Sequence, residues 1–196
     1  MKITLPDNSS RELPEGSSGY DLAKDIGPGL AKSAVAVSVD GVQRDLHDVI
    51  EGDSSVSIIT IDSDEGIEIM RHTLTAQVLA RAIKNLYPKS KLAIGPTIDD
   101  GFYYDVESEK SISSDDLSKI EDEMKKIIKT KSSITKKLVS KSEALKVFKE
   151  NKESYKEIIV NESKQKDNFQ LYYQDDKKFV DSVSYTHLRA HETSRN

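Results

Sequence analysis

The chain has 196 residues, of which 36% are hydrophobic and 32% charged, with no Cys and no Trp. This length suits one medium domain or two small ones, and the lack of cysteine excludes disulfides, thiolate zinc sites and cysteine nucleophiles within these residues. No apolar run approaches the roughly 18 residues of a membrane span, and the N-terminus lacks the apolar core of a signal peptide. The net charge of −5 argues against nucleic-acid binding through bulk positive charge alone. We expect a soluble, cytoplasmic globular protein.

Charge is distributed unevenly along the chain. Residues 1–62 carry five basic and eleven acidic residues, whereas residues 107–168 carry fifteen lysines and thirteen acidic residues. This contrast indicates an acidic domain at 1–62 and a mixed-charge domain at 63–182, separated by the polar run 62–66.

The first domain has a small α+β pattern. Alternating apolar residues and turn signals predict the order strand, strand, helix, strand, strand, at residues 3–5, 11–13, 20–26, 34–39 and 56–61. A Gly-Pro-Gly sequence at 27–29 is expected to end the helix. This order over about sixty residues resembles a β-grasp fold.

The second domain opens with a long helical pattern. Apolar residues keep a 3.6-residue rhythm from 66 to 87, and Pro88 follows. Ser113 and Asp116 have the spacing of a capping box and precede a further amphipathic helix. The remaining elements are expected to be a hairpin over 92–106, helices over 142–148 and 153–159, and a strand over 169–173. These elements predict a mixed α/β domain. We expect this domain to be incomplete, because strands or helices that would cover part of its core are missing.

The last residues, 183–196, differ in character from the rest. His187 and His191 lie four residues apart, as in some helical metal sites, but no third ligand is near, and we do not count them as ligands. The string from 183 to 193 resembles the translation of a sequencing adapter. We therefore interpret 183–196 as a non-native tail and the chain as an N-terminal fragment of a longer protein.

Short segments in a fixed order carry a family resemblance. Residues 2–7, 25–32 and 56–60 resemble the TGS domain at the start of threonyl-tRNA synthetases. Five later segments resemble the editing domain that follows it: IMRH at 69–72, LAIGP at 92–96, GFYYD at 101–105, SYK at 154–156 and FVD at 179–181. The resemblance covers nearly the whole chain before the tail.

The resemblance implies proofreading of tRNA. One methyl group is worth only about 1–3 kcal/mol in a binding pocket, so a site for threonine also accepts serine. The family's editing domain hydrolyses the resulting seryl-tRNA at the 3′ end of tRNA(Thr). The implied partner is therefore the acceptor end of tRNA(Thr), with no membrane partner, and the family forms homodimers through domains that this chain lacks.

Aminoacylation is not expected from these residues. The family's ATP, Mg and Zn sites lie in a downstream core, and this sequence has no glycine-rich phosphate loop and no Cys-His-His zinc motif. We therefore expect no cofactor in this fragment.

The match is partial on the long helix, where the family carries two histidines four residues apart. If the match is aligned on Arg71, His72 stands at the first histidine position, and Gln77, five residues later, stands at the second. If it is aligned on 76–79 instead, Thr73 and Gln77 stand at the two histidine positions. In an α-helix a spacing of four leaves side chains about 40° apart, and a spacing of five about 140°. His72 and Gln77 therefore converge only if the helix starts after His72 or bulges there.

The remaining candidate residues match positions that line the family's editing pocket. A lysine can contact a phosphate or orient water, a carboxylate can hold the substrate ammonium, and a tyrosine offers a flat face and a hydroxyl. The implied catalytic residues are His72, Lys156 and Asp181, and the implied substrate-binding residues are Tyr104, Tyr172 and Gln77. The family's later cysteine and third histidine follow the position of Asp181 and have no counterpart here, so whether this fragment is an active enzyme stays open.

Two other functions are compatible with the sequence. The broken histidine pair also suits a free-standing RNA-binding or regulatory module of the TGS type, without catalysis. A trans-editing hydrolase without the synthetase core is the third hypothesis. The lysines between 125 and 149 could contact tRNA phosphates or form an ordinary solvated helix face.

Overall fold

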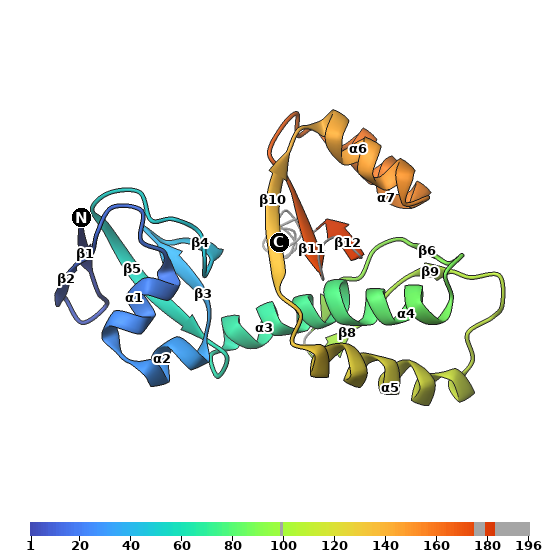
Figure 1. The fold of residues 1–196 in the computed structure, drawn as a ribbon, viewed down its shortest axis with the longest axis horizontal. Coiled ribbons are helices and arrows are strands. Elements are labelled where there is room, and N and C mark those ends of the chain that lie inside the picture. Colours follow the sequence, from blue (N-terminus) through green and yellow to red (C-terminus); the bar gives the residue numbers. More distant parts are fainter. Residues whose placement is uncertain (99, 175–178, 183–196) are drawn as a thin grey trace, which may run out of the picture. The chain divides into compact units, whose positions relative to one another are not determined.

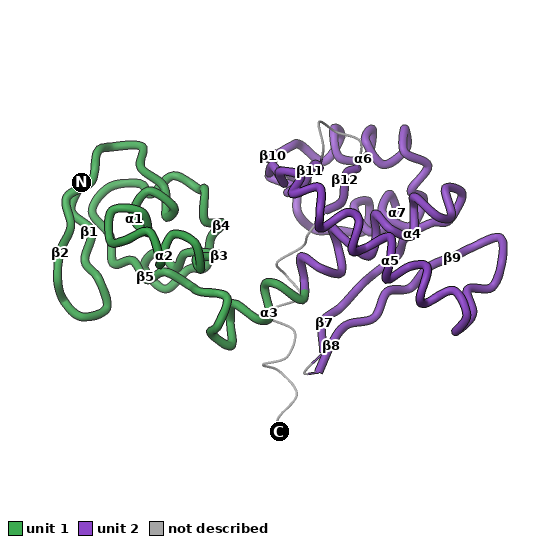
Figure 2. The backbone as a smooth tube through the Cα atoms, turned by 60° about the horizontal axis from the view of Figure 1, so that its bottom comes forward, with its two compact units in different colours: residues 1–71 green, residues 72–196 purple. Residues whose placement is uncertain are grey.

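The computed structural model describes residues 1–98, 100–174 and 179–182 (Figure 1). The chain forms two compact units, residues 1–71 and residues 72–196, drawn in different colours in Figure 2. The fold is mixed α/β, as the sequence predicts. The boundary between the units in the chain falls within helix α3 (Asp64–Thr73), which begins inside the polar run of residues 62–66. The tail 183–196, with His187 and His191, lies outside the described residues.

Unit 1 contains the β-grasp sheet that the sequence predicts. The strand order is β2-β1-β5-β3-β4, and β1 pairs with β5 in parallel while the other pairs are antiparallel. The strands are β1 (Lys2–Thr4), β2 (Ser10–Glu12), β3 (Ala34–Val39), β4 (Val42–Asp45) and β5 (Ser54–Thr60). The parallel pairing of the first and last strands is the feature that places both in the centre of the sheet.

Helix α1 (Gly19–Ile26) packs its apolar face into the core of unit 1. Ser18 and Asp21 form a reciprocal capping box at its start, which satisfies backbone donors that the first turn leaves open. Leu22 is completely buried among apolar residues of three strands and one loop: Ile3, Val37, Val56 and Ile50. The helix ends before Gly27 as expected, but Pro28 then starts a second short helix, α2 (Pro28–Ser33), because proline suits a first helical turn.

The long helix predicted at residues 66–87 is present and contains a π-helical turn. After α3 the chain forms the π-helical turn Leu74–Leu79 and then α4 (Ala80–Leu86). The N–H of Ala80 donates to the carbonyl of Thr75, five residues earlier. A π-helical turn accommodates one more residue than an α-helical turn and is frequent at functional sites. This turn lies between His72 and the end of the long helix and contains Gln77, and whether the two side chains converge stays a prediction.

The rest of unit 2 consists of an irregular hairpin, a three-stranded sheet and three helices. In the hairpin, β6 (Lys91–Leu92) pairs with β9 (Val106–Glu107), and β7 (Thr97–Ile98) pairs with β8 (Gly101–Phe102). The sheet has the order β10 (Ile134–Val139), β11 (Phe169–Gln174) and β12 (Phe179–Ser182), all antiparallel. The helices are α5 (Ser114–Thr130), α6 (Lys141–Glu150) and α7 (Ser154–Glu162).

The three-stranded sheet separates two apolar clusters in unit 2. Leu171 and Phe169 pack with Ala144 and Phe148 of α6 and Val160 of α7. Phe179 instead packs with the α4 and α5 residues Ala80, Ile83, Ile120 and Ile127. Because side chains alternate between the faces of a strand, Asp181, two residues after Phe179, lies on the face that carries the second cluster. None of the described helices is long and apolar enough to cross a membrane.

Gly66 allows the start of α3 to approach the last strand of unit 1. A Cβ at this position would lie 1.9 Å from the carbonyl oxygen of Thr60, a backbone atom that cannot rotate away. We expect Gly66→Ala to lower the free energy of unfolding of unit 1 by about 3 kcal/mol, which urea denaturation measures. Gly29→Ala in α2, where a Cβ meets nothing within 4 Å, is the matched control. An equal stability of the two variants would contradict this packing.

Candidate functional site

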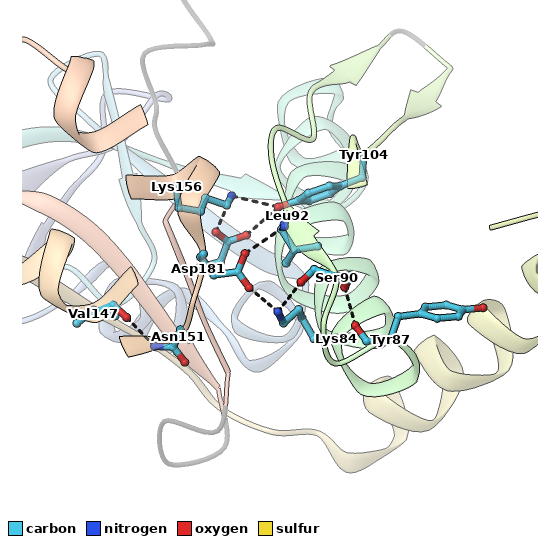
Figure 3. A network of polar contacts seen from close by, with 10 residues as sticks. Lys84, Tyr87, Ser90, Leu92, Tyr104, Val147, Asn151, Lys156 and Asp181 are labelled. Carbon is cyan, nitrogen blue, oxygen red and sulfur yellow. Dashed lines mark hydrogen bonds and ion pairs between the residues drawn. The ribbon is translucent and has the colours of Figure 1, made fainter. Parts of the chain in front are cut away.

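Tyr104, Lys156 and Asp181, which the sequence nominates from three separate segments, lie in direct contact (Figure 3). Lys156 Nζ lies 2.8 Å from Asp181 Oδ1 and donates to the Tyr104 hydroxyl over 3.1 Å. The Tyr104 hydroxyl donates to Asp181 Oδ2 over 3.2 Å. The hairpin, α7 and β12 each supply one side chain. We call these three residues the Lys156 cluster.

The Lys156 cluster is largely shielded from water. Lys156 is 7% exposed and Asp181 is 1% exposed. Burial and the nearby Asp181 carboxylate raise the pKa of the Tyr104 hydroxyl far above its ordinary value. Tyr104 is therefore a neutral hydrogen-bond donor rather than a base. Its ring also faces the ammonium group, with Lys156 Nζ 5.6 Å from the ring centroid, a cation–π distance.

A second buried ion pair fixes the helix that carries Lys156. Glu153 is the residue just before α7 and is 5% exposed. Its carboxylate lies 2.6 Å from Lys84 Nζ of α4 and accepts the N–H of Leu92 over 3.0 Å. Lys84 also donates to the carbonyl of Ser90, so one network joins α4, β6 and α7 (Figure 3). The sequence analysis missed Glu153 and Lys84, since neither belongs to a motif; the only signal was an acidic residue at the start of a predicted helix.

Tyr172 lies next to the Lys156 cluster without its hydroxyl joining it. Tyr172 and Asp181 are directly opposite in the pairing of β11 with β12, so their side chains share a face of the sheet. The Tyr172 hydroxyl donates to Gln170 Oε1 over 3.1 Å. Tyr172 thus lies beside Asp181 on one face of the sheet, and its role in substrate binding stays a prediction.

Gln77 is buried in the π-helical turn and is held by β11. It is 2% exposed, and Gln174 Nε2 donates both to its backbone carbonyl over 2.8 Å and to its Oε1 over 3.1 Å. Arg81 in turn donates to Gln174 Oε1 over 2.9 Å. Sequence reasoning nominated Gln77 but missed Gln174 and Arg81, which become neighbours only through tertiary folding. His72 lies in the last turn of α3 with a half-buried side chain, and its role in hydrolysis stays a prediction.

Gly95 brings the hairpin close to the π-helical turn. A Cβ at this position would lie 2.4 Å from Cδ2 of Tyr104 and 2.7 Å from Cγ2 of Thr75. Tyr104 and Thr75 therefore both pack against this glycine. Only a residue without a side chain allows both contacts.

The described residues contain no group of three or more His, Asp or Glu side chains placed to hold a metal ion. The Lys156 cluster itself offers one ammonium, one carboxylate and one phenol. Such groups can bind a polar substrate, orient water and transfer protons.

The comparison with known families identifies the first unit. Residues 1–60 match the family model of the TGS domain. The match agrees with the β-grasp sheet of unit 1 and defines this part of the chain as a TGS domain. A TGS domain is a module associated with tRNA and GTPase proteins. It covers less than a third of the chain and does not include the Lys156 cluster.

Removing one charge of the Lys156 cluster should lower the free energy of unfolding of unit 2 far more than removing both charges. Lys156→Met leaves a buried carboxylate without its counter-ion, which we expect to lower the free energy of unfolding of unit 2 by about 3–5 kcal/mol. The double variant Lys156→Met/Asp181→Leu leaves no buried charge and should recover much of that loss. A double-mutant cycle by urea denaturation measures the coupling. Additive effects of the two single substitutions would contradict a coupled pair.

Gly95→Ala should displace Tyr104 from the cluster. The added methyl meets an aromatic ring on one side and Thr75 on the other, and we expect a loss of about 1–3 kcal/mol in the free energy of unfolding. A change in the Tyr104 ring signals in NMR spectra should accompany it. Gly101→Ala, at a hairpin position where a Cβ meets nothing within 4 Å, is the control. Unchanged Tyr104 signals in Gly95→Ala would show that the glycine is not required.

Proposed function

We propose that unit 2 is an editing module that binds the 3′ end of tRNA(Thr) and hydrolyses a serine ester carried there, in the N-terminal part of a threonyl-tRNA synthetase. The observation that carries this proposal is the Lys156 cluster. Three segments that resemble the family's editing domain, more than 70 residues apart at their extremes, supply three side chains in mutual hydrogen-bond contact. The TGS domain at residues 1–60 precedes the module, the order expected of that family.

Asp181 has the acceptor capacity to bind the substrate's amino group. A carboxylate offers about four lone-pair sites. Lys156 Nζ and the N–H of Ser182 occupy Oδ1, at 2.8 and 2.7 Å, and the Tyr104 hydroxyl occupies one site on Oδ2. Among the described contacts of Asp181, the second site on Oδ2 remains for a ligand. We propose that the ammonium group of the aminoacyl ester binds there.

Lys156 can contribute a donor to the reaction. Its ammonium has three N–H groups, and the described contacts use one on Asp181 and one on Tyr104. The third can hold the attacking water or an oxygen of the terminal ribose. In the reaction, water adds to the ester carbonyl carbon and the bond from that carbon to the ribose oxygen breaks. The ribose oxygen takes up a proton that the water releases, which leaves free serine and tRNA with its hydroxyl restored.

This reaction needs no co-substrate other than water, and we therefore propose no cofactor for the module. The ATP, Mg and Zn of the family belong to the aminoacylation chemistry of a separate core. The substrate itself brings the phosphates and the amino group that the module has to recognise, so binding depends on charge and on salt concentration.

One observation favours a second candidate function, RNA binding without hydrolysis. Gln77 occupies the place of a family histidine, and a carboxamide is not a general base. Its side-chain oxygen is also engaged by Gln174. A module of this kind would bind the tRNA acceptor end and release no amino acid.

Deacylation of tRNA by the full chain tests the proposal. We expect the chain to release serine from seryl-tRNA(Thr) faster than the uncatalysed rate and to spare threonyl-tRNA(Thr). Tyr104→Phe and Asp181→Asn should reduce the rate by about 10²-fold or more, since each removes one oriented group. Lys166→Ala, an exposed lysine in the loop before β11 and outside the lysine-rich stretch 125–149, is the control and should leave the rate unchanged.

The outcomes separate the candidates. Binding of a tRNA acceptor stem without any release of serine would favour the second function. The absence of both binding and hydrolysis would overturn both.

A further inference from the structure

The side-chain nitrogen of Gln77 is a buried hydrogen-bond donor without a partner among the described residues. The residue is 2% exposed, so this NH₂ group is shielded from bulk water. Leaving a buried donor unsatisfied is costly, and native proteins do so rarely, often at sites where a ligand binds. Gln77 therefore needs an explanation beyond packing.

The orientation of the Gln77 carboxamide is determined by its neighbours. Arg81 can only donate hydrogen bonds, so the Gln174 side-chain atom that faces it is the oxygen, at 2.9 Å. Gln174 Nε2 then faces Gln77, where it contacts the side-chain oxygen and the backbone carbonyl. Because Gln174 holds the oxygen of Gln77, the NH₂ group of Gln77 points away from Gln174.

Two chains of contacts link the π-helical turn of Gln77 to the Lys156 cluster. Gln174 and Tyr172 are two residues apart on β11, so they lie on the same face, about 7 Å apart along the strand. Tyr172 is paired with Asp181 on that face. On the other side, Thr75 of the π-helical turn and Tyr104 both contact the position of Gly95. The turn that carries Gln77 is thus tied to the cluster through β11 and through the hairpin.

We infer that Gln77 Nε2 donates a hydrogen bond to the carbonyl oxygen of the bound aminoacyl ester, and that Gln174 is the positioning residue that aims it. This inference rests on the proposed function and names one contact between the chain and its substrate. The carbonyl oxygen gains negative charge when water adds to its carbon, and a fixed donor stabilises that charge. The position occupied by a histidine in the family thus acts here as a hydrogen-bond donor, not as a base.

Gln77→Glu is the sharpest test. The substitution keeps the shape and an oxygen for Gln174, but replaces the donor NH₂ with an acceptor. We expect release of serine from seryl-tRNA(Thr) by the full chain to fall about 10²–10³-fold at neutral pH, mainly in kcat. On acidification from about pH 7 to about pH 5, protonation of the new buried carboxyl restores a donor, so the deficit relative to the unmodified chain should shrink. Gln165→Glu, on an exposed loop, is the matched control and should show neither effect.

Gln174→Met tests the positioning role. It removes the contact that holds Gln77 and should lower kcat with a smaller change in KM, while Gln77 itself is unaltered.

A readout independent of hydrolysis uses an amide-linked analogue of seryl-adenosine, which is not cleaved. We expect its binding to the full chain to shift the NMR signals of the Gln77 side-chain NH₂, and we expect that shift to be lost in Gln174→Met. Binding without a shift, or hydrolysis unaffected by Gln77→Glu, would overturn this inference and leave the proposed function standing. Neither binding nor hydrolysis by the unmodified chain would overturn both.

Discussion

The ion pair between Lys156 and Asp181 is the interaction on which the arrangement of unit 2 depends. Both charges are removed from water, and each is stable only because the other is 2.8 Å away. The pair holds the last described strand against α7, and Tyr104 adds the hairpin to the same point. Apolar residues of similar volume would avoid the desolvation cost of the two charges, and this is why we propose the pair as part of a site for a polar ligand.

The surrounding structure keeps that pair in place by local means. Glu153 and Lys84 anchor the start of α7 to α4 and β6, three residues before Lys156. The π-helical turn keeps Gln77 on the buried side of the long helix in spite of the five-residue spacing from His72. The wider turn thus changes the direction of the side chains that follow it, and Ala80, Ala82 and Ile83 of α4 are buried in the core.

Sequence reasoning succeeded where local chemistry decides the structure. The apolar run at 34–39, the capping box at Ser113 and the 3.6-residue rhythm from 66 to 87 each predicted the element that is present. Sequence reasoning failed to predict the strands β10 and β12. β10 contains lysines and β12 is short, and both form because they pair with β11. For the site, motif resemblance found Lys156 and Asp181, but Gln174 belongs to no motif and only tertiary folding shows its role.

The pH titration of Tyr104 tests the central claim most directly. An ordinary tyrosine has a pKa near 10 and is mostly ionised at about pH 11. If the Tyr104 hydroxyl is buried between Lys156 and Asp181, its pKa is raised and the residue is still a neutral phenol at that pH. The NMR signal of the ring carbon bonded to the hydroxyl oxygen distinguishes the two forms. The Asp181→Asn variant, which removes the neighbouring negative charge, should titrate at lower pH than the unmodified chain. A Tyr104 signal that titrates at the ordinary tyrosine pKa in the folded protein would contradict the buried cluster and the site built on it.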